Sequence, residues 1–171
     1  LALSPMDPEG RKALDAAIAS ARSLARIVDD ILDFSKIEAG KLELSAAPTL
    51  VGQAIAGVAE TYARLASAKG IAIRQRVDPA LSPALVVDSL RLTQVLNNLV
   101  SNAIKFTARG EVEIGADLVE RSPRLERVRF WVRDTGIGMD EAMCRRIFQS
   151  YVQGASDTAR RYGGTGLGLA I

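Results

Sequence analysis

Two glycine-rich runs near the C-terminal end of the sequence have the composition of a phosphate-binding backbone. They read DTGIGM at 134–139 and GGTGLGL at 163–169, and a polar, arginine-bearing stretch lies between them. Because glycine lacks a Cβ atom, the backbone can approach a ligand closely or adopt a positive φ, and its N–H groups can then point at phosphate oxygens. The two runs therefore predict a nucleotide phosphate site with a movable cover.

A helical stretch upstream could supply polar ligands to the same site. Asn98 and Asn102 lie one turn apart and Lys105 follows three residues later, so one face of the helix predicted from Leu90 to Phe106 carries all three. An amide oxygen can complete the coordination of Mg²⁺, and a lysine ammonium can meet phosphate oxygens. Taken alone, the same stripe could equally be a solvent-exposed polar face.

Asp134 stands where an apolar strand is predicted to end and the first glycine run begins. Its carboxylate would face a pocket at the edge of the sheet, where it could accept a hydrogen bond from the exocyclic amine of adenine. The alternative is that Asp134 only caps the turn before a helix that starts near Asp140. The glycines of the second run precede the apolar residues 169–171, and a helix starting there would offer free N–H groups to an anion.

Composition limits the remaining chemistry. The net charge of +2 gives no support to a nucleic-acid or membrane-surface partner, and no apolar run is long enough to cross a bilayer, so we expect a soluble chain. The absence of histidine excludes Ser-His-Asp and Cys-His catalysis, and with a single cysteine it leaves no zinc ligands. Cys144 is expected to be a small buried residue of a short helix. Any metal should be a hard cation held by oxygens.

The N-terminal part of the chain predicts one long amphipathic helix from Asp7 to about Lys36. Asp7 can cap it, Pro8 suits its first turn, and apolar residues recur at three- and four-residue steps. About thirty helical residues span roughly 45 Å, so the apolar stripe needs a partner along its length, either an upstream helix or a second subunit. The alternative is an ordinary amphipathic helix docked on its own domain.

The rest of the chain predicts an α+β sandwich, with helices on one face of a mixed or antiparallel sheet. Gly40 ends the long helix, and residues 41–48 read as a connector with a short extended piece. The predicted elements that follow are a helix from 51 that Gly70 ends, strands at 71–73 and 85–87, the helix at 90–106, and a hairpin of strands at 112–118 and 128–132. Trp131 falls opposite the inward residues of its strand and is expected to pack rather than bind.

Four motifs in order resemble those of the catalytic ATP-binding part of bacterial two-component sensor histidine kinases, in the GHKL superfamily of kinases and ATPases. NNLVSNAIKFT at 97–107 resembles the asparagine box and DTGIGM the adenine-contacting box, while IFQSYVQG at 147–154 resembles the phenylalanine box and GGTGLGLAI the second glycine box. Upstream, DILDFSKIEAGKLEL at 30–44 is similar to the end of the second dimerisation helix and its linker, in the style of hybrid kinases.

The resemblance implies a domain organisation. Residues 1–40 would belong to the dimerisation and histidine phosphotransfer domain, 41–48 would be the linker, and 49–171 would form a two-layer ATP-binding domain of the Bergerat type. The phosphoacceptor histidine and the last strands of that domain are expected to lie outside this sequence, which we expect to be a truncated record of a longer chain.

The resemblance also implies roles for individual residues. Asn102 would hold Mg²⁺, Asn98 and Lys105 would be the catalytic residues, and Asp134 would bind the adenine amine. Phe148 and Tyr151 would anchor a lid. The full set implied to bind the nucleotide is Asn98, Asn102, Lys105, Asp134, Gly136, Gly138, Met139, Arg161, Tyr162, Gly164, Thr165, Gly166, Leu167, Gly168 and Leu169.

The function that the resemblance implies is a histidine kinase core. It would bind Mg-ATP and transfer the γ-phosphate to a histidine outside this sequence, for relay to the receiver aspartate of a response regulator. The chain would form a homodimer through its N-terminal helix. It would be the cytoplasmic part of a larger sensor kinase, either membrane-anchored or free, and would itself contact neither nucleic acid nor membrane. The alternatives are an ATPase of the same superfamily and a non-catalytic nucleotide-sensing or dimerising module. Asn98 favours the kinase, because an amide cannot take a proton from water as the usual glutamate of the ATPases does.

Overall fold

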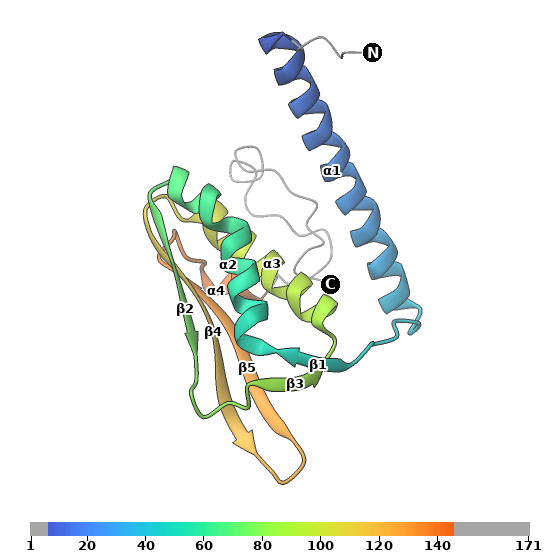
Figure 1. The fold of residues 1–171 in the computed structure, drawn as a ribbon, viewed down its shortest axis with the longest axis vertical. Coiled ribbons are helices and arrows are strands. Elements are labelled where there is room, and N and C mark those ends of the chain that lie inside the picture. The colour runs from blue at the N-terminus through green and yellow to red at the C-terminus, as the bar shows by residue number, and fades with distance from the viewer. Residues whose placement is uncertain (1–6, 146–171) are drawn as a thin grey trace, which may run out of the picture. The chain divides into compact units, whose positions relative to one another are not determined.

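The computed structural model describes residues 7–145, which fall into two compact units that we describe separately (Figure 1). The first unit ends at Leu42 and the second begins at Glu43. The domain boundaries expected from the sequence stay a prediction.

Residues 7–42 of the first unit contain one helix, α1 (Pro8–Glu38), as the capping signals predict. Asp7 caps it by accepting a hydrogen bond from the backbone N–H of Gly10. At the other end Gly40 adopts a φ of +62°, and the N–H of Lys41 bonds to the carbonyl of Lys36. Large apolar side chains along α1 stay exposed, namely Leu14, Ile18, Leu24, Val28, Ile31, Leu32 and Ile37.

The second unit is the predicted α+β sandwich. Its elements are β1 (Ala47–Leu50), α2 (Val51–Ala68), β2 (Ile71–Val77), β3 (Ala84–Val87), α3 (Ser89–Phe106), β4 (Gly110–Arg121), β5 (Glu126–Asp134) and the short α4 (Glu141–Cys144). The main sheet has the order β2-β4-β5, with β2 parallel and β5 antiparallel to β4. Helices α2 and α3 cover one face of this mixed sheet (Figure 1).

One strand pairing differs from a single-sheet arrangement. β3 does not join the main sheet but pairs antiparallel with β1, and Thr49 lies opposite Leu85 in their register. Pro79 and Pro83 lie in the segment between β2 and β3, and because proline has no backbone N–H they disfavour a strand there. The chain therefore leaves the main sheet before β3 begins.

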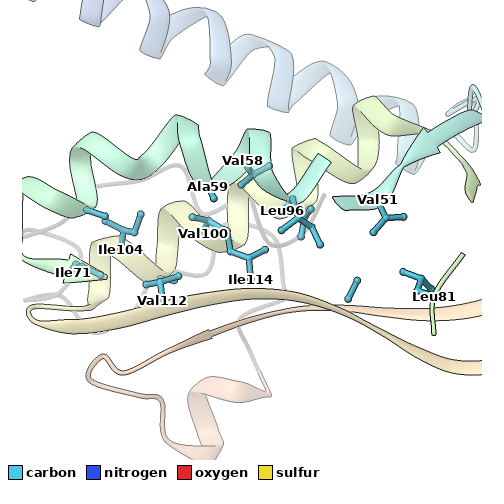
Figure 2. Packing of buried hydrophobic residues seen from close by; sticks show 14 residues of the cluster. Val51, Val58, Ala59, Ile71, Leu81, Leu96, Val100, Ile104, Val112 and Ile114 are labelled. Carbon is cyan, nitrogen blue, oxygen red and sulfur yellow. The ribbon is translucent and has the colours of Figure 1, made fainter. Parts of the chain in front are cut away.

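The core lies between the two helices and the sheet (Figure 2). Alternate residues of β4 face it, and they meet apolar side chains from α2 and α3. The largest fully buried side chains are Ile55, Leu96, Ile104, Ile114, Val51, Val58, Val100 and Val112, with Thr107. This packing directs the apolar face of α3 toward the sheet, so the opposite face of the helix can carry polar groups.

The ends of α3 are fixed by polar side chains from elsewhere in the unit. Asp88 caps the N-terminus, and its carboxylate also accepts a hydrogen bond from the N–H of Ser45 at 2.8 Å. The backbone N–H of Arg91, and then that of Ser45, lower the pKa of Asp88. At the C-terminal end, Nζ of Lys69 donates to the carbonyl of Ile104 at 2.8 Å, which satisfies a carbonyl that no later turn of the helix can reach.

Trp131 packs on the outer face of the sheet, as its position in the strand predicts. Its indole lies across Gly115 on β4, and its Nε1 donates to Asp117 at 3.0 Å. Arg76 and Arg133 place their guanidinium groups 5.2 and 5.5 Å from the ring centroid. Asp117 also accepts from Arg76 and Arg129, so an ionic cluster surrounds the indole.

Two further observations concern residues 7–145. Cys144 lies in a short helix as expected, but it is exposed, so the prediction that it is buried was wrong. A four-residue helix is barely more than one turn and has no face broad enough to bury a side chain in the core. No helix of the described part is both long enough and apolar enough to cross a membrane.

Candidate functional site

The polar stripe predicted on α3 is present. Asn98, Asn102 and Lys105 are all half-buried, while Leu96 and Val100 on the other side of the helix are fully buried. The burial of the apolar face therefore fixes the direction in which the three polar side chains project. Lys105 places its ammonium 5.1 Å from the centroid of the Phe106 ring.

Asp134 stands at the end of β5, on the strand face that also carries Phe130 and Val132. One of its carboxylate oxygens, Oδ1, accepts a hydrogen bond from the N–H of Gly136 at 2.8 Å. Asp134 thus does shape the turn, as the alternative interpretation held, but the cap of the following helix is Asp140, whose Oδ1 accepts from the N–H of Met143 at 2.7 Å.

The first glycine run sits against the C-terminal end of α3. The N–H of Ile137 is 3.4 Å from the carbonyl oxygen of Phe106, and a Cβ atom on Gly136 would lie 2.6 Å from that same oxygen. Gly138 adopts a φ of +67°, which a side chain would disfavour. Two motifs that are far apart in the sequence, the asparagine stripe and the DTGIGM run, are thereby joined at Phe106.

Sequence reasoning missed one pair of residues in this region. Thr135 bonds to the backbone at the start of β4, and Gly110 gives its side chain the room to do so. The threonine is part of the quoted motif, but nothing in the sequence indicates which residue it would contact. Oγ1 of Thr107, just after α3, is buried and has no hydrogen-bond partner among residues 7–145.

Several predicted site residues lie outside the described residues. These are Arg161, Tyr162, Gly164, Thr165, Gly166, Leu167, Gly168 and Leu169, together with Phe148 and Tyr151 of the expected lid. Met139 is described and exposed.

A hollow of about 470 Å³ lies along β5 and its neighbours. Arg76, Asp117, Arg129, Trp131 and Arg133 line it from the outer face of the sheet, together with Val132 and Asp134. Its described lining includes none of the polar residues of α3, so this hollow does not connect the two motifs.

The donor set on α3 suits a magnesium nucleotide better than a metal held by protein alone. Within residues 7–145 no group of three or more His, Cys, Asp and Glu side chains could hold a metal ion. Mg²⁺ commonly keeps several waters and takes few protein ligands besides phosphate oxygens, which is what a single amide oxygen such as that of Asn102 can complement. The arrangement thus offers a carboxylate acceptor at Asp134, amide oxygens at Asn98 and Asn102, and the ammonium group of Lys105.

Two family models match the chain. Residues 87–171 match the model described as histidine kinase-, DNA gyrase B- and HSP90-like ATPase, and residues 2–40 match the His Kinase A (phospho-acceptor) domain. The two matches together cover most of the chain.

Individual relatives are longer proteins. The chain is 37% identical over 166 residues to the signal transduction histidine-protein kinase BarA of Escherichia coli, covering 97% of the chain and 18% of BarA. It is 43% identical over 152 residues to the sensor histidine kinase GacS of Pseudomonas protegens, covering 89% of the chain and 17% of GacS. The chain therefore spans less than a fifth of the length of these relatives.

A solved structure shows the same architecture. The full-length ShkA structure in complex with AMPPNP superposes with a TM-score of 0.78 at 36% sequence identity, covering 98% of this chain and 33% of that one.

Proposed function

Because this chain belongs to the sensor histidine kinases of the GHKL superfamily, we propose that it binds Mg-ATP and transfers the γ-phosphoryl group to a histidine outside its own sequence. The observation that carries the proposal is the contact of Gly136 and Ile137 with the carbonyl of Phe106. This contact holds the turn that carries Asp134 against the C-terminal end of α3, which supports a single site for the adenine base and the phosphates. The ATP analogue named with ShkA supports the choice of nucleotide.

Each described residue has one task in this proposal. Asp134 accepts a hydrogen bond from the adenine amine through Oδ2, while Oδ1 accepts from the N–H of Gly136. Asn102 supplies an amide oxygen to Mg²⁺, Asn98 orders that ion or its water, and Lys105 contacts phosphate oxygens. When bound, Mg²⁺ would neutralise charge on the phosphates. We assign the phosphate contacts to residues 164–169 and the lid to Arg161 and Tyr162.

Asn98 is the residue that favours transfer over hydrolysis. An amide side chain does not accept a proton at neutral pH, so it cannot act as general base on a water molecule. Phosphoryl transfer requires mainly positioning and charge neutralisation, which the site supplies for an incoming imidazole nitrogen. That imidazole must belong to another chain or segment, since this sequence contains no histidine.

The remaining assignments concern partners and location. The exposed apolar side chains of α1 support a homodimer through that helix, with the phosphoacceptor domain and a receiver domain as phosphotransfer partners. We place the chain in the cytoplasm, as part of a longer sensor kinase. We also keep the boundaries 1–40, 41–48 and 49–171 for the dimerisation part, the linker and the catalytic domain.

The test is transfer of labelled γ-phosphate from ATP to a separately supplied dimerisation fragment that contains its histidine. We expect label on the fragment, and we expect Asn102→Ala to abolish both the transfer and the Mg²⁺ dependence of ATP binding. ATP binding without transfer would indicate the nucleotide-sensing module instead. Unchanged affinity in Asn102→Ala would also count against the kinase.

A further inference from the structure

We infer that Thr135 is a positioning residue for adenine recognition: its hydroxyl clamps the turn that carries Asp134 to the start of β4. The inference rests on the function proposed above, in which Asp134 reads the adenine amine. It adds a residue that acts through Asp134 and does not itself touch the nucleotide.

Thr135 makes two hydrogen bonds to Glu111 on the neighbouring strand β4. Its Oγ1 accepts from the N–H of Glu111 at 3.0 Å, and its own backbone N–H donates to the carbonyl of Glu111 at 3.2 Å. The hydroxyl proton can go to the carbonyl of Glu111 at 3.4 Å or to that of Arg109 at 3.5 Å. The side chain thus extends the β4–β5 ladder past Asp134, the last residue of β5.

Gly110 is shaped to receive this side chain. It adopts a φ of +117°, and a Cβ atom added to it would lie 2.2 Å from Oγ1 of Thr135 and 3.3 Å from its Cβ. Any residue with a Cβ atom at position 110 would therefore force the hydroxyl of Thr135 to move. Positive φ and close approach both require glycine here, which indicates that the clamp is a built feature and not an incidental surface contact.

The clamp adds a second restraint to the turn that carries the base-reading carboxylate. Asp134 is bonded through Oδ1 to the N–H of Gly136, and Gly136 lies against the carbonyl of Phe106 at the end of α3. Thr135, between these two residues, is held by Glu111. The orientation of Oδ2 is therefore set from two directions, by β4 through the threonine and by α3 through the glycine.

Removing the hydroxyl of Thr135 should reveal its effect on the position of the Asp134 carboxylate. Thr135→Val keeps the shape of the side chain but cannot accept from Glu111, whereas Thr135→Ser keeps the acceptor and loses a methyl group. Because Thr135 and Glu111 are not buried, water can replace the lost bond, so the loss in stability should be small. The carboxylate of Asp134, by contrast, gains conformational freedom. It must lose this freedom again when it binds adenine, so the affinity for ATP should fall.

The test compares binding of ATP and of inosine triphosphate, which has no exocyclic amine, to the full chain in the presence of Mg²⁺. We expect wild type to prefer ATP and Thr135→Val to bind ATP about three- to tenfold more weakly, as for the loss of one neutral hydrogen bond. Its affinity for inosine triphosphate should not change. Thr135→Ser should keep the preference, and Gly110→Ala should lose it, because its Cβ displaces the hydroxyl.

A matched control removes a threonine hydroxyl elsewhere. Thr61 on α2 is exposed and donates to the carbonyl of Gly57 at 2.8 Å, so Thr61→Val should leave both affinities unchanged. Asp134→Asn should abolish the ATP preference. Its amide oxygen keeps the hydrogen bond from Gly136, so its amide NH2 group, which is a donor, replaces the acceptor Oδ2 that would meet the adenine amine.

The outcomes separate the inference from the proposed function. If Asp134→Asn loses the preference but Thr135→Val and Gly110→Ala both keep it, the clamp has no positioning role and only the inference is overturned. Equal weakening of both nucleotides in Thr135→Val would likewise reduce the residue to a structural one. If wild type does not distinguish the two nucleotides, the adenine assignment of Asp134 fails, and the inference fails with it.

Discussion

Gly136 packs directly on the carbonyl oxygen of Phe106, so that a Cβ atom at position 136 would lie 2.6 Å from it. This contact joins the end of the asparagine-bearing helix to the turn that carries Asp134. It requires glycine for lack of space, because the backbone oxygen it meets cannot swing aside as a flexible side chain could.

We expect Gly136→Ala to push the turn away from α3 and to weaken ATP binding. The strain should also lower the free energy of unfolding by about 1–3 kcal/mol, as for other overpacked sites. Titration with ATP and thermal melting measure the two effects. The matched control is Gly57→Ala on α2, where an added Cβ meets nothing within 4 Å and should stabilise the helix by about 0.5–1 kcal/mol. Unchanged ATP affinity in Gly136→Ala would contradict the contact.

Gly115→Ala should disturb the outer face of the sheet and leave the proposed nucleotide site unaffected. A Cβ there would lie 2.2 Å from Cζ2 of Trp131, so the indole must leave its position across β4. We expect a loss of about 1–3 kcal/mol in unfolding free energy, as for an overpacked contact. Trp131 is the single tryptophan of the sequence, so its fluorescence emission reports the displacement directly. An unshifted emission spectrum would show that the indole does not lie on Gly115.

Asp117 should make the stability of the second unit depend on pH in the acid range. Hydrogen bonds from Arg129, and then from Arg76, hold the pKa of Asp117 below its ordinary value in the folded protein. A lowered folded pKa stabilises the fold above the pKa of the unfolded chain, and the contribution is lost as the pH falls through the folded pKa. We therefore expect Asp117→Asn to have a lower melting temperature than wild type at neutral pH. This difference in melting temperature should shrink as the pH falls below the ordinary pKa of a carboxyl group. A difference that grows on acidification would contradict this assignment.

Lys69 should stabilise the C-terminal end of α3 from the neighbouring helix. Lys69→Met removes the hydrogen bond from Nζ to the carbonyl of Ile104 and keeps most of the aliphatic stem. We expect a loss of roughly 1 kcal/mol in unfolding free energy, the usual worth of one such bond. Lys12→Met on the exposed face of α1 serves as control and should cost less. Equal melting temperatures of the two variants would show that the hydrogen bond from Lys69 adds nothing to stability.

The features that sequence reasoning predicted are those with local signals. The caps of α1, the polar stripe of α3 and the β4–β5 hairpin each follow from periodicity or turn residues within a short stretch. The pairing of β3 with β1 has no such signal, because nearly forty residues separate Pro48 from its partner Val86. For the same reason the contact of Thr135 with Gly110 could not be predicted. Cys144 was wrongly expected to be buried because its four-residue helix has no face broad enough to pack on the core.

The fate of the γ-phosphate tests the central claim most directly. With labelled ATP and a separate dimerisation fragment carrying its histidine, the account predicts that label accumulates on that fragment and that little inorganic phosphate is released, because Asn98 cannot activate water. Asp134→Asn should reduce the labelling through weaker ATP binding. Brisk release of inorganic phosphate by wild type, unaltered in Asn98→Asp and without label on the fragment, would contradict the histidine kinase and identify an ATPase.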